Sequence, residues 1–117
     1  MIPESAVGLI RGRHDMPVSR YIFEDVENVL DFAELQRIAD CFVAETCNIQ
    51  GRYGAAVNHA DLGDIRLWKG DPLDVVVTGL TACTTAVMYA CAKCGVPLTL
   101  WHFDRETGDY VPQFFQF

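Results

Sequence analysis

The stretch Val75–Ala86 reads VVVTGLTACTTA, and it decides the fold. Three β-branched valines lead into a Gly/Thr turn, and small residues that favour a helix follow the turn. This pattern is typical of a strand that leads directly into a helix N-terminus. In parallel α/β folds this junction lies at the carboxyl edge of the sheet, where free backbone N–H groups and the helix dipole favour an anionic ligand. The stretch therefore predicts an α/β domain with an anion site at the Gly/Thr turn.

The threonines of this turn admit two interpretations. The hydroxyls of Thr78, Thr81 and Thr84 crowd the junction and could bind phosphate or ribose oxygens. Alternatively, Thr81 caps the helix and the other hydroxyls bond to nearby backbone groups. The turn has no lysine and no second glycine, so it matches neither a P-loop nor a dinucleotide fingerprint. Both interpretations remain open from the sequence.

The rest of the chain predicts alternating strands and helices. A capping pair, Asp31 and Glu34, precedes apolar residues at three- and four-residue spacing, which indicates a helix over Phe32–Thr46. A second helix is expected from about Ala82 to Cys94, where Gly95 ends it. Strands are expected at Ala6–Ile10, Tyr21–Phe23, Asp74–Thr78, Leu98–Phe103 and Tyr110–Phe117, with a turn at Asp104–Asp109 joining the last two.

These elements form a single α/β domain over residues 1–117, a small Rossmann-like sheet with flanking helices and a C-terminal β-hairpin. The strands on either side of the second helix form a right-handed crossover if they are parallel. The first helix either covers the opposite face of the sheet or lies beside the second helix, so three layers and two layers are both open. Gln50–Gly70 is expected to be a loop with at most one short strand.

Length, composition and charge narrow the class of protein. The 117 residues are 50% hydrophobic, which suits one compact domain. The N-terminus does not have the pattern of a signal peptide, and no segment has the length of a membrane-spanning helix, so we expect a cytoplasmic protein. A net charge of -7 opposes nonspecific binding to duplex DNA and to anionic membranes.

The five cysteines are interpreted as packing residues. Cys91 and Cys94 form a CxxC pair, but at a helix C-terminus, where the dipole does not favour a thiolate. A zinc site needs two more ligands at a paired spacing, and the other cysteines and histidines do not show one. We therefore expect neither a metal nor a cofactor.

A local cationic segment follows the first predicted strand and contains Arg11, Arg13, His14 and Arg20. This segment either holds a small anion or is a solvated loop whose arginines pair with neighbouring carboxylates. We prefer His14 as the functional histidine because it follows the first predicted strand. The carboxyl ends of parallel strands lie at one edge of a sheet, which is also the edge of the Gly/Thr turn. His102 alternates onto the face of the leucines in its strand, so we expect a core or interface histidine.

The sequence lacks the Gly-x-Ser-x-Gly, Walker A and HExxH motifs. Metal-free cleavage of a phosphodiester requires none of these motifs. An RNA can attack its own phosphate through the 2′-hydroxyl when a protein fixes the geometry and stabilises the charge. We assign the catalytic roles to His14 and Arg13. The candidate ligand-binding residues are Arg11, Arg13, Thr78, Gly79, Leu80, Thr81 and Thr84.

The strand, the Thr78-Gly79-Leu80-Thr81 turn and the helix that follows resemble the CRISPR-associated Rossmann-fold (CARF) proteins and their small stand-alone ring-nuclease relatives. The phosphate loop of that family often reads Thr-Gly-Gly-Thr-Lys, so Thr78, Gly79 and Thr81 match, while Leu80 and Ala82 depart from it. Arg13 could replace the missing lysine. The resemblance implies a homodimer that binds a cyclic oligoadenylate and either degrades or sequesters it.

A second hypothesis comes from the acidic composition and the aromatic end of the chain. Phe114, Phe115 and Phe117 could serve a protein partner or a subunit interface, which would make this a noncatalytic interaction or sequestering protein.

Overall fold

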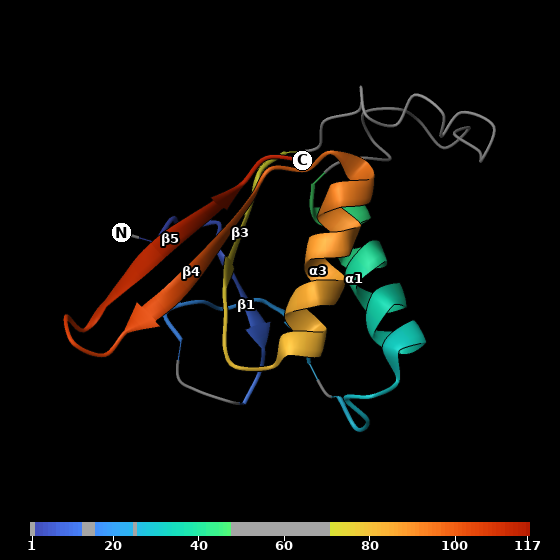
Figure 1. Ribbon diagram of the computed structural model, residues 1–117, viewed down its shortest axis with the longest axis horizontal. Helices are drawn as coiled ribbons and strands as arrows, with labels where there is room; N and C mark the ends of the chain where they lie inside the picture. The colour runs from blue at the N-terminus through green and yellow to red at the C-terminus, as the bar shows by residue number, and fades with distance from the viewer. Residues whose placement is uncertain (1, 13–15, 25, 48–70) are drawn as a thin grey trace.

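The computed structural model describes residues 2–12, 16–24, 26–47 and 71–117, which form a five-stranded sheet and two helices (Figure 1). The predicted α/β fold with a C-terminal hairpin is confirmed, and the predicted loop over Gln50–Gly70 lies outside the described residues. In chain order the elements are β1 (Val7–Ile10), β2 (Tyr21–Phe23), α1 (Phe32–Thr46), β3 (Leu73–Val76), α3 (Thr81–Cys94), β4 (Leu98–Asp104) and β5 (Asp109–Phe115).

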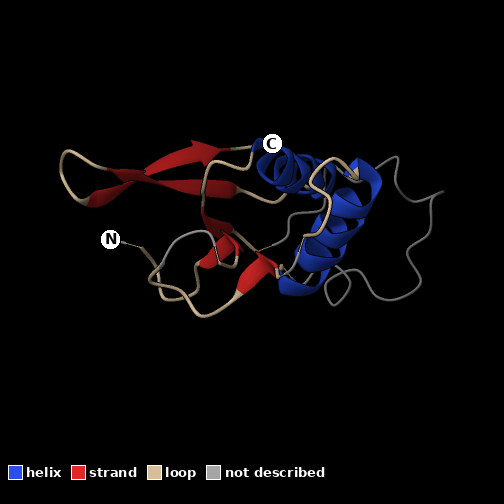
Figure 2. Cartoon of the chain, turned by 90° about the horizontal axis from the view of Figure 1, so that it is seen from below, coloured by secondary structure: helices blue, strands red, loops and turns tan. Residues whose placement is uncertain are grey.

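The strands lie in the order β2-β1-β3-β4-β5, and all neighbouring strands are parallel except β4 and β5. The chain steps from β2 to β3 and from β3 to β4 in the same direction across the sheet. Right-handed crossovers in one direction place their helices on one face. Figures 1 and 2 show α1 and α3 packed side by side on that face. The described elements therefore form two layers.

On the other face of the sheet, the described residues that pack against the strands come from the connection between β1 and β2. The step from β1 to β2 runs in the opposite direction across the sheet. Met16 and Val18 in this connection pack on a small apolar cluster formed by Ala6, Val76 and Trp101. This cluster is separate from the larger core between the sheet and the helices.

Local signals determine the first helix. The Asp31 carboxylate Oδ1 accepts a hydrogen bond from the Glu34 backbone N–H at 3.2 Å, which is the expected cap. The buried residues Leu35, Ala39 and Val43 form a stripe at helical spacing that faces the core. Both ends of the predicted helix are confirmed.

Polar contacts join the two helices at the edge of their interface. The Gln36 Nε2 amide donates to the Ala86 backbone oxygen at 3.0 Å and to Asp40 Oδ1 at 2.9 Å. Lys93 Nζ donates to Asp40 Oδ2 at 2.8 Å. These bonds fix α3, and with it the turn that precedes α3, relative to α1. Among the described residues, neither helix has the length and apolar character of a membrane span.

Alternation within the strand predicted a core or interface position for His102. Its side chain is exposed, so the core position is wrong, and the interface position stays a prediction. β3 ends at Val76, which pairs with Trp101, so His102 lies on the part of β4 that extends beyond its parallel neighbour. Within the described part of the chain, β3 therefore does not extend far enough to flank His102.

The cysteine positions predict a pattern of thiol reactivity. Burial raises the pKa of Cys47 to about 12 and raises that of Cys91 as well, so both thiols are protonated at neutral pH. Cys41 is exposed, so the interpretation of the cysteines as packing residues is wrong for Cys41. Because the thiolate is the reactive form, we expect a thiol reagent to modify Cys41 rapidly, and Cys47 and Cys91 only as the protein unfolds. Mass spectrometry of the labelled protein checks this. Cys41→Ser should remove the fast phase, and rapid labelling of Cys47 in the folded protein would contradict the assignment.

Candidate functional site

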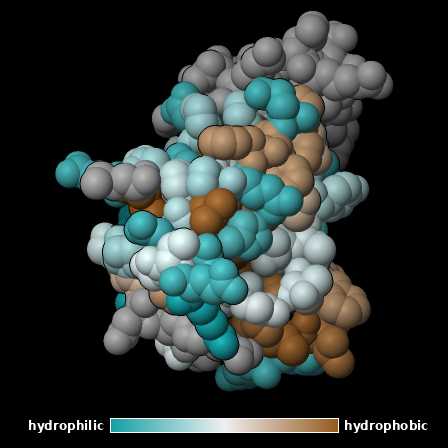
Figure 3. All heavy atoms as spheres, turned by 60° about the vertical axis from the view of Figure 1, so that its left-hand side comes forward, coloured by the Kyte–Doolittle hydropathy of each residue, from teal (hydrophilic) through white to brown (hydrophobic). Residues whose placement is uncertain are grey.

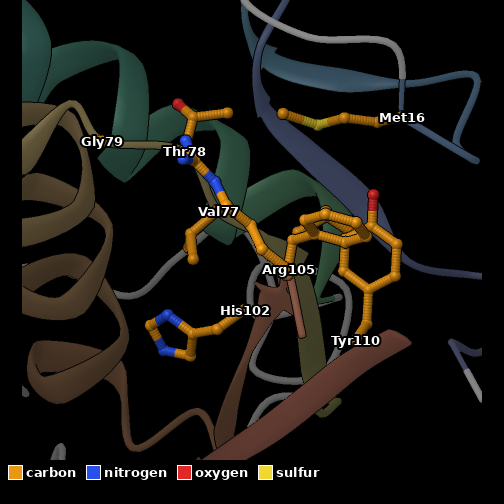
Figure 4. Close-up of a pocket in the computed structure, with 9 residues that line it drawn as sticks. Met16, Val77, Thr78, Gly79, His102, Arg105 and Tyr110 are labelled. Atoms are coloured by element: carbon orange, nitrogen blue, oxygen red, sulfur yellow. The ribbon is translucent and has the colours of Figure 1, made fainter. Parts of the chain in front are cut away.

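A pocket of about 630 Å³ lies at the carboxyl ends of β3 and β4 (Figure 4). Its walls come from the Gly/Thr turn, from the end of the β4–β5 hairpin and from the β1–β2 connection. In Figure 4, Met16 and Tyr110 lie on one side of the pocket, and Val77 and His102 lie on the other. The lining residues are Met16, Val76, Val77, Thr78, Gly79, His102, Phe103, Arg105 and Tyr110.

The turn between β3 and α3 is anchored at both ends. The Val77 backbone N–H donates to the Trp101 oxygen at 3.1 Å, and the Thr84 N–H donates to the Leu80 oxygen at 3.1 Å. Leu80 is the N-cap of α3 and makes no side-chain cap hydrogen bond, so Thr81 is not the cap. The first turn of this helix thus presents its N-terminal dipole beside the pocket without a capping side chain.

The threonine hydroxyls differ in their bonding. Thr84 Oγ1 donates to the Leu80 oxygen at 3.2 Å, and Thr85 Oγ1 donates to the Thr81 oxygen at 3.0 Å, so both satisfy local backbone. Thr78 Oγ1 is buried and has no hydrogen-bond partner among the described residues. A buried hydroxyl without a partner is destabilising, and a polar group on a ligand would satisfy it. Of these three hydroxyls, Thr78 is therefore the one available to a ligand in the pocket.

The hairpin contributes an aromatic wall. Phe103 and Tyr110 are cross-strand partners, and their ring centroids lie 5.2 Å apart with the rings tilted by 58°. On the other face of β4, His102 Nε2 lies 2.8 Å from Gln113 Oε1, which fits an imidazole whose Nε2 carries the proton. This contact holds the His102 ring in one orientation at the pocket.

Among the described residues that line the pocket, Arg105 is the one with a permanent positive charge. Five of the nine lysine and arginine side chains lie in the described part of the chain. Arg37 and Lys93 pair with carboxylates, Arg11 pairs with Glu24, and Arg20 Nη2 donates to a threonine hydroxyl. Within that part, Arg105 alone makes no ion pair, hydrogen bond or cation–π contact, so its guanidinium is available to an anion.

The predicted site residues are only partly brought together. Thr78 and Gly79 line the pocket, whereas Leu80, Thr81 and Thr84 begin the adjoining helix without lining it. The predicted catalytic residues Arg13 and His14 lie outside the described residues.

Arg11 pairs with a carboxylate, as expected if the cationic segment is a solvated loop whose arginines pair with neighbouring carboxylates. Its guanidinium binds both carboxylate oxygens of Glu24, with Nη2 3.2 Å from Oε1, and lies 4.5 Å from the centroid of the Tyr21 ring. The hydrogen bond from Arg11 lowers the pKa of Glu24. Arg11 does not line the pocket.

The sequence did not single out Phe103, Arg105, Tyr110 or Met16 as site residues. Phe103 and Tyr110 were assigned to strands and Arg105 to a turn, which is where they lie. The predicted order of elements could have found three of them, because it places the turn of the hairpin and the Gly/Thr turn at the same edge of the sheet. Residues beside the hairpin turn, such as Phe103, Arg105 and Tyr110, were therefore candidates for the site.

A second, smaller pocket of about 280 Å³ lies at the N-terminus of α1 and is lined by Glu27, Asp31 and Glu34 among other residues. Its carboxylates make it unsuitable for an anion. Among the described residues, no group of three or more histidine, cysteine, aspartate or glutamate side chains is arranged to hold a metal ion. Comparison of the chain with protein-family models, curated proteins and solved structures gave no match.

Proposed function

We propose that this protein binds a cyclic oligonucleotide second messenger, of the cyclic oligoadenylate class, in the pocket at the carboxyl ends of β3 and β4. The observation that carries the proposal is the combination in one pocket of an unpaired arginine, a buried hydroxyl without a partner and two aromatic rings. Arginine and the helix N-terminus suit phosphate, and aromatic rings suit a nucleobase. The choice of cyclic oligoadenylate as the ligand class comes from the resemblance of Thr78, Gly79 and Thr81 to the phosphate loop of the CARF proteins.

The net charge of -7 does not oppose this proposal, because the charges close to the pocket determine whether an anionic ligand is attracted to it. No carboxylate is among the described residues that line the large pocket, whereas three line the small one. An anionic ligand would therefore meet Arg105 and the α3 N-terminus in the large pocket without direct repulsion from its walls.

Cleavage of the bound ligand is the activity that we propose for this site. The ligand's own 2′-hydroxyl attacks the adjacent phosphorus, the bond from phosphorus to the 5′-oxygen breaks, and the proton of the hydroxyl ends on that oxygen. The products are a 2′,3′-cyclic phosphate and a 5′-hydroxyl, and no water is consumed. The protein's task is to align the groups and to stabilise charge, for which Arg13 and His14 remain the predicted residues.

The test is a panel of cyclic oligonucleotides that differ in ring size and base. Titration calorimetry measures binding, and chromatography of the products, with and without EDTA, measures cleavage. Binding with EDTA-resistant cleavage supports the whole proposal, and binding without turnover supports a sequestering protein. If no member of the panel binds, the proposal is wrong.

A noncatalytic interaction protein is the second candidate, and the exposed hairpin favours it. Phe114 is 76% exposed, and Phe103 and Val111 are about half exposed. Figure 3, which brings the hairpin side forward, shows hydrophobic side chains in separate groups among hydrophilic ones. A protein partner that covers the hairpin would bury these side chains.

We expect the protein to be a homodimer in which the hairpin faces of two copies meet. Phe114 lies on the face of the hairpin opposite α3, is 76% exposed and does not line the pocket. Pro112 interrupts the free edge of β5 and opposes strand addition there, so a face-to-face contact is favoured. Light scattering should give twice the 13.1 kDa mass of one chain, and Phe114→Asp should give a monomer. A monomeric mass for the unmodified protein at micromolar concentration would count against the dimer.

A further inference from the structure

The aromatic wall of the pocket is a fixed platform. Tyr110 packs on the apolar cluster that contains Val76 and Trp101, and the Trp101 indole Nε1 donates to Asp74 Oδ1 at 3.0 Å. The turn below it is closed by a hydrogen bond from the Gly108 N–H to the Asp104 oxygen at 2.8 Å. The ring of Tyr110 is therefore held by the core of the domain and does not depend on a ligand for its position.

The platform keeps part of its aromatic surface open. Phe103 is 53% exposed, and the 58° tilt between the two rings leaves them as adjoining surfaces of one wall. Met16 contributes an apolar thioether to the same side of the pocket as Tyr110 (Figure 4). A flat apolar group suits this side, and the polar groups Thr78 and Arg105 contribute to the same pocket of about 630 Å³.

We propose that Phe103 and Tyr110 stack on a nucleobase of the bound ligand while Arg105 contacts the phosphate of the same nucleotide. This inference rests on the proposed function in taking a nucleotide as the ligand, and it names the residues that recognise the base. Stacking is tolerant of base identity, because every base has a π face. The platform therefore distinguishes a nucleotide, which has a base, from a sugar phosphate, which has none. It distinguishes a purine from a pyrimidine only by the area of the ring that stacks.

Three small probes separate the base from the phosphate. Titration calorimetry is carried out with AMP, ribose 5-phosphate and adenosine on the unmodified chain and on four variants. Tyr110→Leu and Phe103→Leu remove a ring, Tyr110→Phe keeps the ring, and Phe114→Leu removes an exposed ring of the same hairpin that does not line the pocket. Thermal melting of each variant confirms that it is folded.

The unmodified chain should bind AMP roughly 5- to 150-fold more tightly than ribose 5-phosphate, the range of one base–aromatic stack. Tyr110→Leu and Phe103→Leu should reduce this ratio severalfold and leave the affinity for ribose 5-phosphate unchanged. Tyr110→Phe and Phe114→Leu should keep the ratio. Equal affinity of the unmodified chain for AMP and ribose 5-phosphate, no measurable binding of AMP, or an unchanged ratio in both leucine variants would overturn the inference.

The two proposals fail separately. If AMP shows the ring-dependent ratio but no cyclic oligonucleotide binds, the platform stands and the second-messenger function is wrong. If cyclic oligoadenylate binds equally well to the unmodified chain and to both leucine variants, the function stands and the platform is wrong.

Discussion

Leu9→Ala is expected to lower the free energy of unfolding by about 2–5 kcal/mol, the range for large-to-small changes in a packed core. Leu9 is completely buried, and it lies on β1, which is enclosed by β2 and β3 in the sheet. Truncation removes apolar contacts and leaves a cavity, because neighbouring strands on both sides prevent the backbone from closing the space.

Chemical denaturation of the two proteins measures the change, and Leu30→Ala is the matched control. Leu30 is 69% exposed, so the same truncation there should change stability by less than about 0.5 kcal/mol. Equal effects at the two positions would mean that β1 is not enclosed in the folded domain.

Arg105→Ala is expected to weaken a phosphate-bearing ligand by about 1.5–3 kcal/mol, which is roughly a 10- to 150-fold loss of affinity. The guanidinium forms no ion pair with the described residues, so its charge is not already neutralised by a carboxylate. A hydrogen bond between two charged groups is stronger than one between neutral groups. The effect should shrink as salt is added, because Arg105 is exposed to solvent.

Calorimetric titration with the cyclic oligoadenylate that binds best tests this prediction, and Arg37→Ala is the control. Arg37 is an exposed arginine on α1 that pairs with Glu34, with Nε 3.0 Å from Oε2, and it does not line the pocket. Its loss should leave affinity unchanged. Equal losses in the two variants would indicate a general charge effect instead of a contact at the pocket.

The sequence predicted the elements that local signals determine. The helix Phe32–Thr46 agrees at both ends, because a capping carboxylate and an apolar stripe specify it without reference to the rest of the chain. The strand expected at Asp74–Thr78 is instead Leu73–Val76. Its end is determined by its pairing with β4, and no local residue marks that position.

The site was less predictable than the fold. The Gly/Thr turn was identified as one wall of the site, because a strand-to-helix junction has a sequence pattern of its own. The core position predicted as one alternative for His102 is wrong, because alternation gives the face of a residue but not how far the neighbouring strand extends. The role of Arg105 depends on which carboxylates lie near it, and that requires the folded structure.

The order of pairing in the sheet has a consequence for how the domain assembles. β4 and β5 are joined by a short turn and can pair by local closure, whereas Val7 pairs with Val75 across most of the chain. Hairpins form in roughly 1–10 μs, and pairing between distant strands is slower. The pocket has walls on the early hairpin and on the turn after β3, and Met16 adds a third wall from the β1–β2 connection, which is in place only after β1 has paired with β3. Ligand binding would therefore report on the last long-range step of folding, and a ligand present during refolding would stabilise only the completed sheet.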